Sequence, residues 1–191
     1  LGLASAASAA EPPNQNDPCS THGRNTCAHT GVGSYERYRY GIRWFGDYRG
    51  VAPVAGPTFC TDLRFWYPSR AYRFREVANE GFTSREGKVL STATQRRMAY
   101  ALWNYGRSRN RDQQAAVMLY VHSLVGDGAP GEVDPSALGT SVEGLFAKIS
   151  RESARLHGPY RIEARISRGL TAGTPATGTV KLVAAGGAAV P

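Results

Sequence analysis

The chain has 191 residues, of which 41% are hydrophobic, and its formal net charge is +8. This length is enough to bury one good hydrophobic core, with the start of a second unit. The cations are spread along the chain without a dense basic run, a phosphate-binding loop or a helix-turn-helix pattern, which argues against a nucleic-acid-binding protein. No run approaches the roughly 18 to 20 consecutive apolar residues of a membrane helix, so we expect no membrane span.

The first residues, Leu-Gly-Leu-Ala-Ser-Ala-Ala-Ser-Ala-Ala, resemble the end of a signal segment with small residues at a cleavage site. Residues 11–34 are rich in Pro, Asn, Gly, Ser and Thr and show no hydrophobic period, which predicts a disordered leader. We therefore expect residues 1–34 to be a signal-peptide remnant followed by a leader. The protein is expected to be secreted and to reside at the cell wall or cell surface.

Two of the three cysteines, Cys19 and Cys27, lie in the turn-rich stretch Pro-Cys-Ser-Thr-His-Gly-Arg-Asn-Thr-Cys, whose ends can meet in a local disulfide. Zinc binding by these cysteines with His22 and His29 is the alternative, but the usual close ligand pairs are missing and a disulfide is favoured outside the cell. We expect no metal and no cofactor. Three interpretations then remain for Cys60: a buried, unreactive thiol, a partner in an intermolecular disulfide, or a reactive group.

From Tyr35 onward, aromatic and polar residues alternate and are interrupted by Gly and Pro, a pattern typical of strands in a half-buried sheet. The pattern returns in Pro-Thr-Phe-Cys-Thr-Asp-Leu-Arg-Phe-Trp-Tyr-Pro, so Cys60 is expected on a strand or just after one. Phe59, Phe65, Trp66 and Tyr67 are close enough in sequence to cover this cysteine.

The hydrophobic period lengthens to three and four between Thr92 and Arg107, which predicts a helix that stops at Gly106. A second helix is expected from Gln113 to Val125, with Asp112 as its N-cap. Because this second run is apolar nearly all round, we expect it to be the buried helix of the domain.

A third, amphipathic helix is expected to end at Gly158, and strands should follow it. The apolar stripe of this helix comprises Val142, Leu145, Phe146, Ile149 and Leu156. The strand pattern returns in Pro-Tyr-Arg-Ile-Glu-Ala-Arg-Ile-Ser and Gly-Thr-Val-Lys-Leu-Val-Ala-Ala. The fold class is therefore α+β, with an aromatic-rich antiparallel sheet packed against a small helical subdomain over residues 35–158. Residues 159–191 are closing strands or the start of an immunoglobulin-like stalk module.

Several of these segments together resemble the thioester domains of Gram-positive surface proteins. The likeness runs from about Tyr35 to Ile166 and rests on Gly-Ile-Arg-Trp-Phe-Gly, Phe-Cys-Thr-Asp, the two helices around Gly106 and Gly-Pro-Tyr-Arg-Ile. In that family a cysteine after an aromatic residue, followed by one residue and Asp, is joined to a helical glutamine. The resemblance implies a monomeric adhesin domain, not an enzyme, that captures an amine on a host or neighbouring-cell surface protein. Cys60 and Asp62 match the cysteine and the Asp.

The glutamine of that motif can be aligned in two frames. In the first frame Met118 takes its position, and methionine cannot form a thioester. In the second frame Gln114 is the acyl donor and Met118 replaces the tryptophan of the pattern Thr-Gln-x-Ala-Ile/Val-Trp. The two positions are four residues apart on one helix face, a displacement of one turn or roughly 5 to 6 Å.

Three alternatives stay open from the residues alone. Cys60 can be a buried thiol in a domain that keeps the fold without the bond, with Gln114 as an ordinary solvated helix former and Met118 as core filling. The same fold can then bind noncovalently through side chains such as Trp44, Trp66, Arg64 and Arg70. Cys60, His122 and either Asp62 or Asp112 can also form a cysteine-histidine hydrolase or transferase site.

Overall fold

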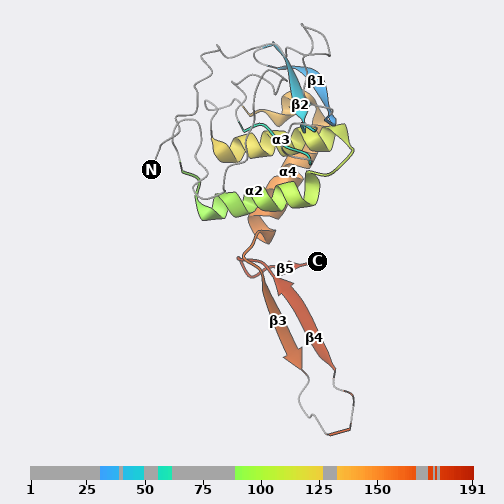
Figure 1. Cartoon of the computed structure of the whole chain (residues 1–191), viewed down its shortest axis with the longest axis vertical. Helices are drawn as coiled ribbons and strands as arrows, with labels where there is room; N and C mark the ends of the chain where they lie inside the picture. Colours follow the sequence, from blue (N-terminus) through green and yellow to red (C-terminus); the bar gives the residue numbers. More distant parts are fainter. Residues whose placement is uncertain are drawn as a thin grey trace.

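The computed structural model describes residues 31–38, 41–49, 56–61, 89–126, 133–166, 172–173, 175 and 177–191. Its architecture combines three α-helices and two antiparallel sheets within this part of the chain, which confirms the α+β class (Figure 1). No helix among the described residues is long and apolar enough to cross a membrane.

Helix α3 (Arg111–Val125) is the central element of the domain. Every residue from Gln114 to His122 is buried, because other elements surround the helix. Helices α2 (Thr92–Tyr105) and α4 (Thr140–Leu156) both contact α3 and each other, and the short 3-10 helix η2 (Pro135–Leu138) lies against α4. The prediction of a buried helix after Asp112 is therefore confirmed.

The N-cap of α3 is Asn110, and the expectation that Asp112 caps this helix is wrong. Asn110 has an extended backbone, and its side-chain oxygen accepts a hydrogen bond from the backbone N–H of Gln113 at 3.0 Å. Asp112 lies inside the first helical turn, where its carboxylate interacts favourably with the positive end of the helix dipole. The helix consequently begins two residues earlier than expected.

Strands β1 (Gly33–Tyr38) and β2 (Gly41–Gly46) form an antiparallel hairpin that contacts α3. The register pairs Tyr35 with Trp44, and their rings lie 5.0 Å apart. Trp44 is only 6% exposed, and its indole N–H donates a hydrogen bond to the carbonyl of Asp47 at 3.1 Å. The expectation that Trp44 is presented to a ligand is therefore wrong, since its ring belongs to the interior.

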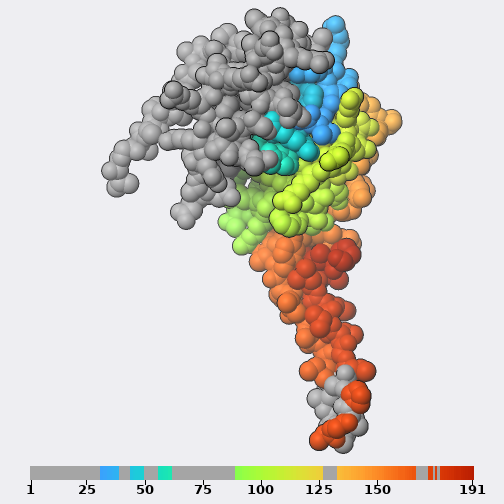
Figure 2. All heavy atoms as spheres, turned by 45° about the vertical axis from the view of Figure 1, so that its right-hand side comes forward, coloured from blue at the N-terminus to red at the C-terminus, as the bar shows by residue number. Residues whose placement is uncertain are grey.

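The strands expected near the C-terminus are present as β3 (Arg161–Ile166) and β4 (Gly178–Val183), which pair antiparallel, and the two-residue strand β5 (Ala189–Val190) pairs with the other edge of β4. The β3–β4 ribbon extends away from the helices (Figures 1 and 2). Its base is attached to the domain by the hydrogen bond from Ala185 N–H to the carbonyl of His157 at 3.1 Å, and by burial of Val183 and Ala184.

Candidate functional site

The segment 56–61, which carries Cys60, is held by backbone pairing with the residues that follow β2. The N–H of Tyr48 donates to the carbonyl of Thr58 at 2.8 Å, and the N–H of Thr58 donates back at 2.9 Å. The hydroxyl of Thr58 adds a third bond to the Tyr48 carbonyl at 2.7 Å. Cys60 follows only two residues later, so this pairing restricts where its side chain can lie.

The Cys60 side chain is present as a partly buried thiol between two groups of apolar residues. On one side it packs against the pair Trp44 and Tyr48. On the other it packs against the core cluster built from α3, its neighbouring helices and the β1–β2 hairpin, of which Met118 is a member. The neighbouring Phe59 packs against the same cluster. This environment limits the access of water to the sulfur.

Gln114 lies in the first turn of α3 and is fully buried, with 0% of its surface exposed. Its side-chain nitrogen donates to the carbonyls of Tyr105 at 3.1 Å and Ser108 at 3.0 Å, which fixes the orientation of the carboxamide. Its side-chain oxygen has no hydrogen-bond partner among the described residues. A buried carbonyl in this state carries an uncompensated desolvation cost of about 1 to 3 kcal/mol.

Arg49 connects the surroundings of Gln114 with the pairing that holds the cysteine segment. Its guanidinium donates to the carbonyl of Ser108 at 3.3 Å, the same carbonyl that accepts from Gln114. It also forms a 2.8 Å ion pair with the buried Asp47, and this hydrogen-bonded partner raises the pKa of Arg49. Since Arg49 directly follows Tyr48, which pairs with Thr58, the segment of Cys60 and the side chain of Gln114 are attached to the same structural unit.

Met118 lies one turn further along α3 and is 1% exposed. Its sulfur accepts a hydrogen bond from the backbone N–H of Gly46 at 3.3 Å. The two alternative positions for the acyl donor are therefore both in the interior, with Gln114 beside the α2–α3 connection and Met118 beneath the end of β2.

His122 is the next residue on this face of α3, since positions 114, 118 and 122 are spaced by four. It is 4% exposed, so its imidazole is also interior. Asp112 is ten residues away on the same helix, which corresponds to about 15 Å along the axis. This separation excludes Asp112 as the group that orients His122, and only the variant of the hydrolase alternative with Asp62 stays open.

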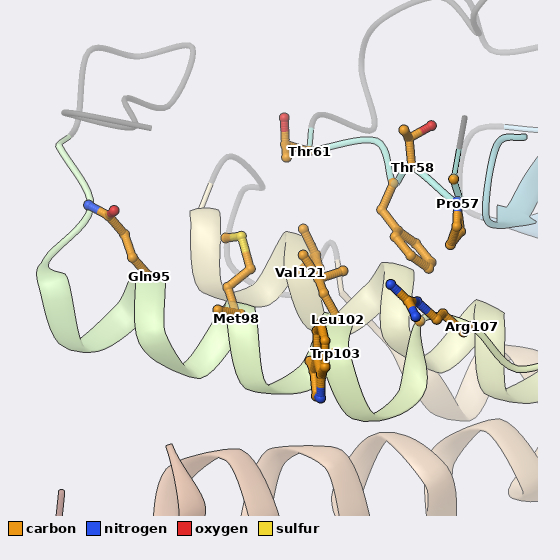
Figure 3. Close-up of a pocket in the computed structure, with 13 residues that line it drawn as sticks. Pro57, Thr58, Thr61, Gln95, Met98, Leu102, Trp103, Arg107 and Val121 are labelled. Atoms are coloured by element: carbon orange, nitrogen blue, oxygen red, sulfur yellow. The ribbon is translucent and has the colours of Figure 1, made fainter. Parts of the chain in front are cut away.

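A cavity of about 590 Å³ lies beside the cysteine segment, between residues 56–61 and helix α2 (Figure 3). Phe59 and Thr61, the two neighbours of Cys60, both line it. The opposite wall includes Leu102, Trp103 and Arg107. Sequence reasoning missed this site. The signal that could have indicated it is Trp103, a large aromatic residue outside the apolar stripe that Met98, Leu102 and Tyr105 form on this helix.

Several residues with a predicted role lie outside the described part of the chain, and the roles expected of them remain predictions. These residues are Cys19, His22, Cys27, His29, Asp62, Arg64, Phe65, Trp66, Tyr67 and Arg70.

Searches of protein-family models, of curated proteins and of solved structures found no match for this chain. The thioester-domain resemblance therefore rests on the sequence motifs alone.

Proposed function

We propose that this chain is a cell-surface binding domain of the thioester-adhesin type, in which Cys60 and Gln114 react with each other and the target supplies an amine. The observation that carries the proposal is the buried carboxamide of Gln114, whose nitrogen is held by two backbone carbonyls and whose oxygen has no partner among the described residues. The proposal includes the detailed form of the α+β fold expected from the sequence, in which an aromatic-rich sheet and a helical subdomain enclose the bond.

The chemistry has two balanced steps. In the first, the sulfur of Cys60 attacks the side-chain carbonyl carbon of Gln114, the thiol proton passes to the departing nitrogen, and a thioester and ammonia form. In the second, a target amine attacks the thioester carbonyl, an amide bond forms, and the thiol of Cys60 is restored. Each domain reacts once, so the process is capture rather than turnover.

The surroundings of Gln114 support the first step. The carbonyls of Tyr105 and Ser108 point at the side-chain nitrogen, where positive charge develops as ammonia leaves. The apolar neighbours of Cys60 reduce hydrolysis of the product, because a thioester survives only where water is scarce.

A noncovalent binding module of the same fold is the second candidate, and Met118 favours it. In the frame that matches the thioester pattern best, the acyl-donor position holds a methionine whose sulfur already accepts a hydrogen bond from Gly46. Such a domain binds its target through surface side chains alone.

The intact mass of the purified protein distinguishes the two candidates. Thioester formation lowers the mass by about 17 Da through the loss of ammonia, and methylamine then adds to the native protein. Both effects should disappear in Cys60→Ala and Gln114→Ala. Gln113→Ala is the matched control, because Gln113 lies in the same turn but is partly exposed, and among the described residues its side chain donates a single hydrogen bond, to the carbonyl of Tyr105 at 3.4 Å. A native mass without this loss contradicts covalent capture and leaves the noncovalent candidate.

A further inference from the structure

The cavity beside the cysteine segment is a groove that runs along α2. Figure 3 places Gln95 near one end and Arg107 at the other, with Met98 and Leu102 on α2 between them. Val121 of α3 lies behind this wall. The groove is therefore apolar along its length and polar at its ends.

Trp103 forms the outer rim of this groove and is 74% exposed. The guanidinium of Arg107 lies 5.2 Å from the centre of its ring, a cation–π arrangement that holds both side chains at the surface. Tryptophan and arginine are the residue types that contribute most to protein interfaces. An exposed tryptophan stacked with an arginine at the edge of a cavity is therefore a favourable anchor for a partner.

The same helix and the residues that follow it carry a group of positive charges that form no ion pair within the described part of the chain. Among the described residues, only Asp47 with Arg49 and Arg161 with Glu163 form carboxylate ion pairs, and the described lining of the groove contains no acidic side chain. The arginines that form no ion pair with a described residue are Arg96, Arg97, Arg107 and Arg109 on α2 and its C-terminal connection, and Arg111 at the start of α3, and of these Arg107 lines the groove. A ligand for this groove should thus bring negative charge.

We propose that the groove binds a peptide segment of the target in which an apolar side chain lies next to a carboxylate. The apolar side chain covers Met98 and Leu102, and the carboxylate pairs with the guanidinium of Arg107 beside Trp103. The apolar lining favours a peptide over an anionic glycan, because sugar hydroxyls placed along it would lose their hydrogen bonds to water.

This inference deepens the proposed function by giving the target a docking site next to the reactive group. Phe59 and Thr61 line the groove and flank Cys60, so a docked peptide lies beside the segment that carries the sulfur. A lysine in or next to that peptide is then presented at a high effective concentration. The docking itself rests on the groove alone and does not require a thioester.

The test is a selection from a random-peptide display library with the Cys60→Ala protein, in which no covalent step is possible. We expect the enriched sequences to combine an acidic residue with a neighbouring apolar residue, and the synthetic form of the most enriched peptide to bind in a fluorescence-anisotropy titration. Trp103→Ala should weaken this binding by about thirtyfold or more. Arg107→Gln should weaken it by about tenfold and reduce its salt dependence.

Exposed residues away from the groove are the matched controls. Ile162→Ala removes an apolar side chain that is 73% exposed on β3, and Arg151→Gln removes an exposed guanidinium on α4, so neither should change the affinity. Unchanged thermal unfolding establishes that the variants fold. Enrichment without acidic residues, binding that is insensitive to both groove variants, or binding of heparin in preference to every selected peptide overturns the docking proposal. Methylamine addition to the native protein is measured separately, so failure of docking and failure of the thioester are distinguished.

Discussion

The backbone N–H of Gly46 donates a hydrogen bond to the sulfur of Met118, 3.3 Å away, and thereby joins the end of β2 to the middle of α3. Both residues are buried, so water does not replace this contact. A thioether is a weak acceptor, but it satisfies a backbone N–H that would otherwise be buried alone. Met118 therefore has a specific role at the site besides filling space.

Replacing Met118 by leucine should lower the free energy of unfolding by about 1 to 2 kcal/mol. The two side chains have similar volume, so the main cost is the N–H of Gly46 left without an acceptor. Met98→Leu is the control, since Met98 is partly exposed on the groove wall and should cost no more than about 0.5 kcal/mol. Urea unfolding measures both values. Equal costs for the two variants would show that the sulfur contact adds nothing.

The residue at position 46 has to be glycine. A methyl group there would come within 2.3 Å of the Val32 carbonyl oxygen and 2.6 Å of the Gly33 Cα, at a φ of +153°. Gly46→Ala should therefore destabilise the fold by about 3 kcal/mol. Gly144→Ala in α4 has open space around the new methyl group and should instead stabilise by about 0.5 to 1 kcal/mol. Thermal unfolding of the two variants checks these opposite signs.

Removal of the α3 N-cap should be more costly than removal of the acid in its first turn. Asn110→Ala deletes the acceptor of the Gln113 N–H and should cost about 1 kcal/mol. Asp112→Ala removes only a favourable charge near the helix start, at a cost of about 0.3 to 0.5 kcal/mol. Chemical denaturation measures the difference, and the reverse order would mean that Asp112 is the cap.

Tyr105 should make the stability of the fold decrease at alkaline pH. Burial, and then its hydrogen bond to the carboxylate of Glu152, raise the pKa of its hydroxyl above the usual value of roughly 10. The unfolded chain therefore loses this proton first as the pH rises. The stabilising contribution is complete below about pH 9 and decreases above about pH 10, where the native state binds more protons than the unfolded one.

The variant Tyr105→Phe isolates this effect. Between about pH 8 and pH 11 the wild type should lose about 1 kcal/mol more unfolding free energy than Tyr105→Phe. Parallel profiles for the wild type and Tyr105→Phe would show that Tyr105 does not cause the loss of stability at alkaline pH.

The helices could be predicted from sequence because their signals are local. The stop at Gly106 and the burial of the run after Asp112 both follow from periodicity and composition, and the structure confirms them. The start of α3 was predicted wrongly because Asn110 and Asp112 are both good caps. Only the backbone conformation, extended at Asn110 and helical from Arg111, decides between them.

The surface and the site were less predictable. Alternation suggests which residues of a strand share a face but not which face is covered, so Trp44 was expected at the surface and is buried, and the exposed Trp103 was not singled out. Glutamine in the first turn of a helix is usually solvated, so the sequence alone suggests an exposed Gln114. It is buried because the carbonyls of Tyr105 and Ser108, on the other side of the helix connection, accept its amide protons.

The amino-acid sequence by itself determined the α+β class, the order of the elements and the presence of a lone cysteine between an aromatic strand pattern and an apolar helix, since these depend on periodicity and residue type along the chain. The tertiary structure alone decided that the segment of Cys60, Arg49 and Gln114 belong to one unit, that Met118 accepts a hydrogen bond from Gly46, and that a groove opens beside Trp103. These relationships join residues far apart in sequence, and only packing and backbone pairing bring such residues together.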